Sequence, residues 1–423
     1  MDPFKQTDIG LIPEDWGLNK LSETSEIIMG QSPPSSTYNS NGNGLPFYQG
    51  KTDFGSIYPK PRIWCTSPSK IAEKNDILIS VRAPVGPTNL SFEKSGIGRG
   101  LSAIRVKQND YLYLYYYLKK IENEIEKLGT GSTFKAINKS QLHNIKIPLP
   151  PLSEQKKIAY VLSKIQQAIE KQEQIIKTTQ ELKKALMQKL FTEGLYGEPQ
   201  KHTEIGPIPE SWEVVPFERV AKLQGGYGFR STDKVIVSNT QLIRMGNLYQ
   251  NLLQLDRSPV FYPNSFTEEY PAYVLYENDL IISLTGTMGK EDYGFVVKVP
   301  KILNRKLLLN QRVARILLNE KLQLDLDYFY YFLLTRKFLD KLYRTAKGTK
   351  QANLSVKEIY NLKVAYPAKS EQVKIGKLLT TLDKKIKSTS EILVQYKHFL
   401  TSALNKLVTG QIRVKDIEFK LAG

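Results

Sequence analysis

The chain has few of the residues that build disulfides and metal sites. Its 423 residues include one cysteine, Cys65, and three histidines, His143, His202 and His398. One cysteine cannot form an internal disulfide, and no histidine stands at metal-ligand spacing from another histidine or from the cysteine. We therefore predict no metal site, and we assign the three histidines to surface or structural positions.

Long apolar runs are missing as well. No stretch of 18 apolar residues occurs, so the sequence predicts no membrane span. The opening residues, MDPFKQTDIG, contain no apolar signal core. Together with the single cysteine, these absences favour a cytoplasmic protein.

The common signatures of catalysis are also absent. The sequence contains no G-x-x-x-x-G-K-[ST] phosphate loop, no glycine-rich dinucleotide fingerprint after a strand, and no Asn-Pro-Pro-aromatic stretch. We therefore predict that the chain is not an enzyme and binds no cofactor of its own. A stand-alone enzyme with a cryptic site, for instance a nuclease, is a weaker alternative that turnover by the purified chain would reveal.

What the chain has in excess is positive charge. It carries 60 lysines and arginines against 42 acidic residues, a net charge of +18. Such an excess describes the partners of a protein rather than its fold, and duplex DNA is a dense line of phosphates. Nucleic acid is the leading partner on this ground, and a merely basic solvated surface is the other interpretation.

The sequence is also an internal repeat. TDIGLIPEDW at residues 7–16 matches TEIGPIPESW at 203–212, and NDILIS at 75–80 matches NDLIIS at 278–283. The phrase SEQ occurs at 153–155 and again at 370–372. The offset grows from 196 (203 − 7) to 217 (370 − 153), so the second copy carries insertions between shared scaffold pieces.

Each copy ends in a pattern typical of a long helix, at residues 153–191 and 370–408. Ser153 and Ser370 are expected as N-caps, and Gly194 and Gly410 as stops. Apolar residues recur in steps of three, four and seven, which is coiled-coil periodicity. The residues expected to pair the two helices are Ile158, Leu162, Ile165, Ile169, Ile176, Leu379, Leu382, Ile386, Leu393, Leu400 and Leu407. The alternative is that each helix folds onto its own globular unit.

These patterns predict an α/β (α+β) fold, in which two mixed α/β domains are separated by two long antiparallel coiled-coil helices related by a pseudo-two-fold repeat. The predicted domains are 1–152 and 199–369, and the predicted helical segments are 153–198 and 370–423. Tyrosine-rich helices are expected at 111–128 and 325–343, as packed core helices rather than base-stacking platforms. About 39 helical residues make a rod of roughly 58 Å.

Long polar loops supply the chemistry of base readout. Arginine suits guanine, amide side chains suit adenine, and lysine and hydroxyl groups suit phosphate. The loops at 129–138 and 347–355 stand at the same place in the two copies. The predicted DNA contacts are Gln31, Ser35, Thr37, Tyr38, Gln49, Lys51, Arg62, Arg82, Arg99, Lys135, Tyr227, Arg230, Arg244, Asn247, Thr285, Lys290, Lys347, Thr349, Lys350 and Gln351.

The duplicated opening phrase, the NDxxIS strand and the two Ser-Glu-Gln helices together resemble the specificity (S) subunit of type I restriction–modification systems. The resemblance covers essentially the whole chain. It departs from the family at Ala368 and Lys369, where an apolar Pro-Pro form is usual. It implies that the two globular domains are target-recognition domains, each reading one half of a split, asymmetric site in double-stranded DNA.

The same resemblance implies a subunit without catalytic activity. Its partners would be two modification (methyltransferase) subunits and the restriction (ATP-dependent translocase and nuclease) subunits. S-adenosylmethionine, ATP and Mg²⁺ would be bound by those partners. The long helices would set the spacer and hold the modification subunits on the exposed faces of residues 156–192 and 374–409. A nucleic-acid-binding scaffold outside restriction–modification is the alternative function.

Overall fold

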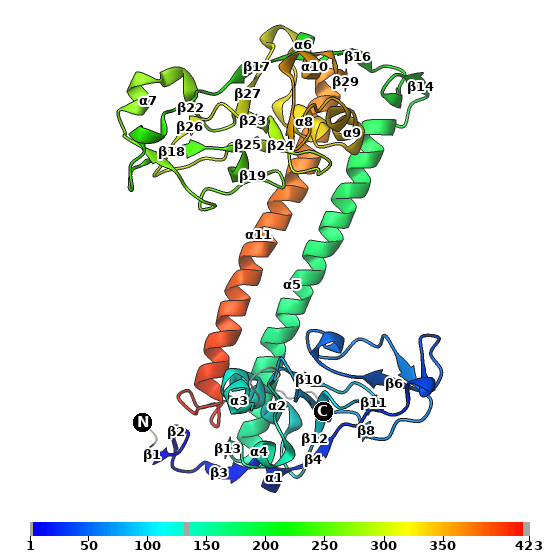
Figure 1. Cartoon of the computed structure of the whole chain (residues 1–423), viewed down its shortest axis with the longest axis vertical. Coiled ribbons are helices and arrows are strands. Elements are labelled where there is room, and N and C mark those ends of the chain that lie inside the picture. The colour runs from blue at the N-terminus through cyan, green and yellow to red at the C-terminus, as the bar shows by residue number, and fades with distance from the viewer. Residues whose placement is uncertain (1–2, 131–134, 418–423) are drawn as a thin grey trace. The chain divides into compact units, whose positions relative to one another are not determined.

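The computed structural model describes residues 3–130 and 135–417. The chain forms two compact units, one from residues 1–174 and 390–423 and the other from residues 175–389. Each unit contains part of both long helices, α5 (Leu152–Glu193) and α11 (Lys369–Leu407). In each unit, short helices gather around one end of a long helix and the strands lie to their side (Figure 1). No helix in the described part of the chain is long and apolar enough to cross a membrane.

The first unit has two main sheets. One has the antiparallel order β10-β9-β12-β4, and the other has the order β5-β7-β6-β11-β8 with a parallel β6–β11 pair. The helices are α1 (Leu21–Thr24), α2 (Tyr111–Lys120), α3 (Glu122–Leu128) and α4 (Lys139–His143). The strands are β1 (Phe4–Thr7), β2 (Gly10–Pro13), β3 (Gly17–Lys20), β4 (Ser25–Met29), β5 (Tyr38–Asn39), β6 (Leu45–Tyr48), β7 (Trp64–Cys65), β8 (Ile71–Ala72), β9 (Ile77–Ser80), β10 (Thr88–Leu90), β11 (Ser95–Ile97), β12 (Leu101–Val106) and β13 (Lys146–Leu149).

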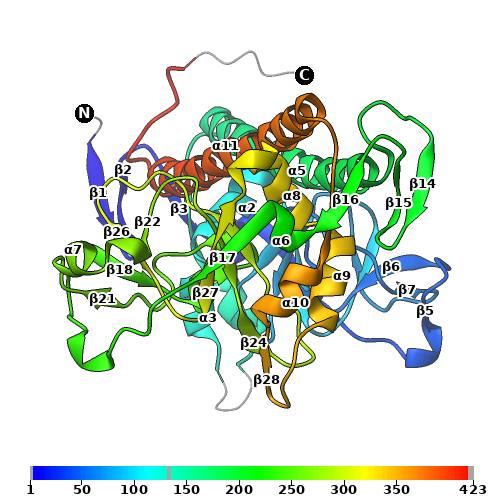
Figure 2. The same cartoon turned by 90° about the horizontal axis from the view of Figure 1, so that it is seen from above.

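The second unit repeats this plan with the orders β17-β27-β23-β25 and β21-β18-β26-β22. Its β18–β26 pair is parallel, like β6–β11, and these strands lie together beside α7 (Figures 1 and 2). The helices are α6 (Phe217–Val220), α7 (Phe266–Glu269), α8 (Leu326–Leu333), α9 (Arg336–Arg344) and α10 (Val356–Asn361). The strands are β14 (Gln200–Thr203), β15 (Gly206–Pro209), β16 (Glu213–Pro216), β17 (Ala221–Gly225), β18 (Thr240–Ile243), β19 (Leu248–Tyr249), β20 (Leu252–Leu253), β21 (Phe261–Tyr262), β22 (Val274–Leu275), β23 (Leu280–Ser283), β24 (Thr285–Thr287), β25 (Val296–Lys298), β26 (Lys306–Leu309), β27 (Val313–Leu318), β28 (Gln351–Asn353) and β29 (Lys363–Tyr366).

The NDxxIS phrase has the same backbone conformation and the same hydrogen bond in both copies. Asn75 and Asn278 both adopt a left-handed backbone with φ of 71°. Asparagine tolerates that conformation better than most residues, because its side chain bonds locally. The following Asp76 and Asp279 each accept a backbone N–H three residues upstream, at 2.8 Å in both copies. The phrase is therefore a turn that starts the central strands β9 and β23.

The tyrosine-rich segments are core helices, as predicted. Tyr113 and Tyr328 are fully buried, and their hydroxyls donate to Pro148 O at 2.6 Å and Ala365 O at 2.8 Å. Burial raises the pKa of both phenols well above 10, so each remains a neutral donor. Each predicted segment is broken into two helices rather than one.

The N-cap prediction for Ser153 and Ser370 is wrong. The helices begin at Leu152 and Lys369, so each serine lies inside its helix, and the backbone N–H groups of Glu154 and Glu371 donate to Pro151 O and Ala368 O. The amide of the buried Gln155 closes the start of α5 instead, because it donates to Pro150 O at 2.9 Å and accepts from the backbone of Asp110. Gln372 makes the equivalent contacts in α11.

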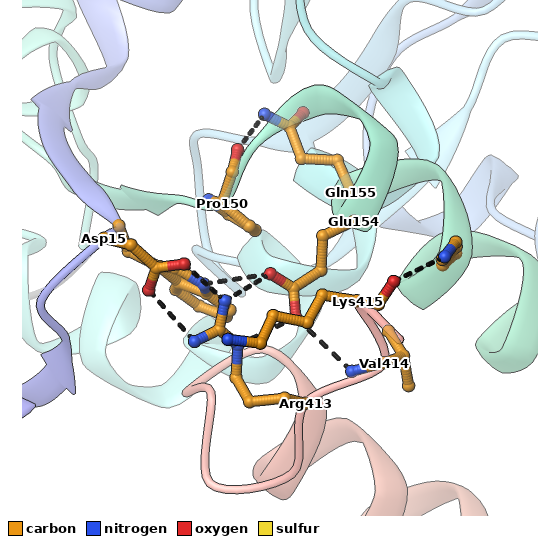
Figure 3. A network of polar contacts seen from close by, with 9 residues as sticks. Asp15, Pro150, Glu154, Gln155, Arg413, Val414 and Lys415 are labelled. Carbon is orange, nitrogen blue, oxygen red and sulfur yellow. Dashed lines mark hydrogen bonds and ion pairs between the residues drawn. The ribbon is translucent and has the colours of Figure 1, made fainter. Parts of the chain in front are cut away.

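The glutamate of each Ser-Glu-Gln phrase, Glu154 or Glu371, connects the start of a long helix to the opening segment of its unit. Glu154 is 1% exposed, accepts from the Trp16 indole at 3.3 Å, and is paired with Arg413 at 2.8 Å. Figure 3 shows Arg413 between Glu154 and Asp15, which it also contacts at 2.7 Å. The arginine holds the pKa of Asp15 below its ordinary value by hydrogen bonding to the carboxylate.

In the second unit, the partners of the equivalent glutamate, Glu371, are an indole and a backbone N–H. Glu371 accepts from the Trp212 indole at 3.2 Å and from the backbone N–H of Leu195 at 2.7 Å. Gly194, just after α5, has φ of +68°, and Gly410, just after α11, has φ of +71°. In each unit the chain leaving one long helix thus packs against the start of the other.

Both long helices contribute to the core of each unit. In the first unit Ile158, Leu162, Ile165 and Ile169 share a cluster with Leu407 and the domain tyrosines, with Leu393 and Leu400 packed against it. In the second unit Leu379 is buried with Leu190, and Leu382 packs against them. Lys397–Glu173 at 2.8 Å and Lys183–Asp383 at 2.6 Å add ion pairs. Ile176 and Ile386 are half-buried. Packing onto the domain and packing onto the other helix therefore occur together.

Candidate nucleic-acid interface

In the first unit, three predicted loop residues lie at the ends of strands. They follow β4, follow β6, and lie in the turn between β11 and β12. Gly30 and Gln31 donate their backbone N–H groups to Leu101 O at 2.9 Å and Ile97 O at 3.0 Å. Gly98 donates to Tyr48 O at 2.8 Å, which places Gln49 beside Arg99. We call the positions Gln31, Gln49 and Arg99 the loop edge of the first unit.

The second unit forms the same edge through the same bonds. Gly226 and Tyr227 donate to Val313 O at 3.1 Å and Leu309 O at 3.0 Å, and Asn310 donates to Ile243 O at 3.2 Å. The hydrogen-bond pattern makes Tyr227 equivalent to Gln31, Arg244 to Gln49, and Gln311 to Arg99. We call these three positions the loop edge of the second unit.

A further loop joins each edge. Val81 donates to Gly100 O at 2.9 Å, and the next residue, Arg82, pairs with Ala136. In the second unit Leu284 donates to Arg312 O at 3.0 Å, and β24 then pairs with β28, so that Thr287 lies opposite Gln351 (Figure 2). The pairing with Ala136 brings the described end of the predicted loop at 129–138 beside Arg82, whereas its residues 131–134 lie outside the described residues.

The structure exposes most of the predicted DNA contacts. At or beside the loop edges these are Gln31, Gln49, Arg82, Arg99, Lys135, Tyr227, Lys350 and Gln351. In the loops that continue from them, the exposed predicted residues are Ser35, Lys51, Arg62, Arg230, Lys290, Lys347 and Thr349, with Thr37, Tyr38 and Arg244 half-buried.

Two of the predicted contacts have structural roles instead. Asn247 is 1% exposed, and its amide donates to Gln254 O and Arg257 O at 3.0 Å. Thr285 is 8% exposed, and its hydroxyl donates to Met245 Sδ at 2.9 Å. Their polar atoms are consumed internally, because buried polar groups must be paired. The prediction that Asn247 and Thr285 contact DNA is therefore corrected: both side chains support the fold of their loops.

Arg62 combines exposure with an internal bond. It binds the buried carboxylate of Asp53 at 2.5 Å, and Asp53 in turn accepts from the backbone N–H of Gln49 at 2.7 Å. Arg62 thus braces the turn that follows Gln49. A contact to DNA from its exposed guanidinium stays a prediction.

The loop edge also contains residues that were missed from the sequence. Gln311 and Arg312 are exposed in the turn between β26 and β27. The sequence offers only a weak signal here, because RGLSAI at 99–104 and RVARI at 312–316 resemble each other loosely, and that match pairs Arg99 with Arg312 rather than with Gln311. Only the hydrogen-bond register equates Gln311 with Arg99.

Three aromatic rings pack against Tyr227. Its ring lies 5.0 Å from Phe229, 5.0 Å from Tyr270 and 5.3 Å from Tyr273, measured between ring centroids. Tyr227 itself is 39% exposed. A ring packed against three neighbours and still 39% exposed is suited to contact a base or sugar.

In the first unit, burial raises the pKa of Tyr48 to about 12, so the phenol that precedes Gln49 stays neutral.

The edges offer hydrogen-bond donors and amide groups. Residues 3–130 and 135–417 contain no group of three or more histidine, cysteine, aspartate or glutamate side chains placed to hold a metal ion. Arginine, glutamine, lysine and tyrosine side chains instead provide groups that recognise bases and phosphates.

Comparisons with known proteins match this arrangement. A family described as "Type I restriction modification DNA specificity domain" matches residues 13–179 and 209–397. The chain is 49% identical to the putative type I restriction enzyme MjaX specificity subunit of Methanocaldococcus jannaschii over 193 residues, 45% of each chain. It is 28% identical to the MjaVIII specificity subunit of the same organism over 98% of this chain and 97% of the other. The crystal structure of a type I restriction–modification S subunit from M. genitalium shares the fold, with a TM-score of 0.64, 17% identity and coverage of 96% and 99%.

Proposed function

We propose, because the chain belongs to the family of type I restriction–modification DNA specificity domains, that it is the sequence-specificity subunit of such a complex. Its alignment spans 45% of the MjaX subunit and 97% of the MjaVIII subunit. Family membership leaves the alternative of a scaffold outside restriction–modification without support.

The observation that carries the proposal is the pair of equivalent loop edges. Both units present polar or aromatic side chains from the same three backbone positions, all exposed except the half-buried Arg244, yet the side chains differ between the copies. A shared frame with different reading groups suits two different half-sites in duplex DNA. The net charge of +18 supports binding to the phosphates on either side.

The division of labour follows the repeat. We assign target recognition to residues 1–152 and 199–369, and spacing of the half-sites to the helical segments 153–198 and 370–423. The start of α5 shares a core with the end of α11, and the end of α5 shares a core with the start of α11. These cores and the two ion pairs between the helices support an antiparallel coiled coil. Its solvent-facing side is the expected docking surface for two modification subunits.

The remaining chemistry is assigned to partners. We expect the chain to have no active site, to bind S-adenosylmethionine, ATP and Mg²⁺ only through the modification and restriction subunits, and to work in the cytoplasm. Its own contribution is binding and orientation of double-stranded DNA.

Methylation-sensitive sequencing of the host genome, with and without the gene, tests this function. We expect adenine methylation at one split, asymmetric motif to disappear when the gene is removed. Unchanged methylation, in a host whose neighbouring modification subunit is active, would refute the specificity role.

A further inference from the structure

The exchange of residue types between the two loop edges carries an inference beyond the general function, and it rests on that proposed function. At the position after the parallel strand, the first unit has Gln49 and the second has Arg244. At the turn before β12 or β27, the first unit has Arg99 and the second has Gln311. One arginine and one glutamine thus occupy each edge, in exchanged positions.

The equivalence of Gln49 and Arg244 is set by the backbone. The N–H of Gln49 donates to the side chain of Asp53 at 2.7 Å, and that of Arg244 donates to the side chain of Asn247 at 3.0 Å. A short 3₁₀ turn follows in both units: Met245–Asn247 begins directly after Arg244, whereas Lys51–Asp53 begins after Gly50, one residue further from Gln49. Buried Asp53 and Asn247 each anchor the backbone at this position. The strand register makes the two positions equivalent, because Gly98 and Asn310 donate to Tyr48 O and Ile243 O, directly before Gln49 and Arg244.

In the first unit the second position lies directly against the first. A Cβ on Gly100 would come within 2.1 Å of Gln49 O, and one on Gly98 within 3.4 Å of Gln49 Cα. Glycine at these places lets the turn that carries Arg99 approach the backbone of Gln49. In the second unit a Cβ on Gly228 would come within 2.8 Å of Gln311 Oε1, so the glycine loop leaves room for that amide.

The half-buried arginine of the second unit is anchored by its own loop. Its Nη2 donates to Ser258 O at 2.6 Å, and its Nε is buried without a hydrogen-bond partner among the described residues. A guanidinium has five N–H donors in a rigid fork, so one anchored nitrogen leaves others for recognition.

We propose that Gln49 with Arg99, and Arg244 with Gln311, are the paired base-reading side chains of the two half-sites. Arginine pairs with guanine and glutamine with adenine through two hydrogen bonds in the major groove. Each half-site therefore contains one guanine and one adenine that are read from equivalent positions of the frame, with the two roles exchanged between the units.

Reciprocal substitutions in the complex with modification subunits test this proposal. Arg244→Gln is expected to change one position of one half-site from guanine to adenine, with a change in preference of about 10- to 100-fold and no change in the other half. Gln49→Arg is expected to make the opposite change in the other half-site. Sequencing of methylated DNA reads both motifs, and Lys222→Gln, an exposed lysine towards the far end of β17, is the matched control.

The outcomes separate this proposal from the general function. A wild-type complex that methylates no split motif refutes the specificity role itself. If the wild type methylates one and Arg244→Gln keeps the same motif at a lower rate, Arg244 contacts phosphate or supports the fold, and the proposal is overturned. If Arg244→Gln lowers the melting temperature of the chain, Gln311→Arg at an exposed position decides, and an unchanged motif then refutes the pairing.

Discussion

The clasp around Glu154 allows a stability prediction with a worked magnitude. Arg413 lies against the carboxylate of Glu154, which is 1% exposed (Figure 3). Replacing Arg413 with alanine leaves that carboxylate with the Trp16 indole at 3.3 Å and the Val414 N–H at 3.4 Å. The side chain of Arg413 is itself only 12% exposed. Because removing one member of a buried pair strands the other charge, we expect a loss of about 3–5 kcal/mol from the first unit.

An exposed pair of similar geometry supplies the control. Arg336 contacts Glu291 at 2.6 and 2.7 Å, but both side chains are more than half exposed. Water and salt screen such a pair, so Arg336→Ala is expected to unfold close to wild type. Urea unfolding of the full chain, followed by tryptophan fluorescence and by circular dichroism, measures both variants and resolves separate transitions if the units unfold independently.

The result that refutes the reasoning is equal destabilisation by the two alanine substitutions. A second comparison isolates the stranded charge. Arg413→Met combined with Glu154→Gln is expected to be more stable than Arg413→Met alone, because the double variant leaves no uncompensated carboxylate. If the double variant is the less stable one, loss of packing rather than charge explains the effect.

Three further predictions concern other parts of the molecule. Lys350→Ala with Gln351→Ala is expected to weaken or relax one half of the methylated motif only, and sequencing that shows equal loss in both halves would contradict this. The contribution of Asp15 to stability is expected to be complete above its ordinary pKa of 3.8 and to be lost as pH falls through its depressed folded pKa, so Asp15→Asn should flatten the acid limb of a pH–stability curve. Leu379→Ala, at a fully buried position, is expected to cost about 2–5 kcal/mol in thermal or urea unfolding, whereas Leu378→Ala, 37% exposed on the same helix, should cost far less.

The parts that sequence reasoning predicted well are those decided by local chemistry. The periodicity at 153–191 and 370–408 located α5 and α11 to within two residues at each end. The repeated NDxxIS phrase fell on the same structural element in both copies, and the structure adds that Asn75 and Asn278 start it with a left-handed backbone. The tyrosine helices were correctly taken as core, since their apolar faces recur at helical spacing.

The errors arose where the partner of a residue lies far away along the chain. Ser153 looks like an N-cap, yet the buried Gln155 and Glu154 control the helix start through contacts to Asp110 and Arg413. Asn247 looks like an adenine reader, yet it is consumed by the backbone of its own loop. Residue type alone does not distinguish an exposed amide from a buried one.

The sequence by itself determined the duplication, the two long helices, the excess of positive charge and the family resemblance. These follow from periodicity, composition and repeated phrases, which need no knowledge of distant contacts. Only the tertiary structure decided which loop residues meet at the sheet edges and which are spent on internal bonds. The equivalence of Gln49 with Arg244 and of Arg99 with Gln311 depends on hydrogen bonds between strands far apart in the chain. Insertions between the copies shift the sequence register, whereas the pairing of strands preserves the position of each side chain.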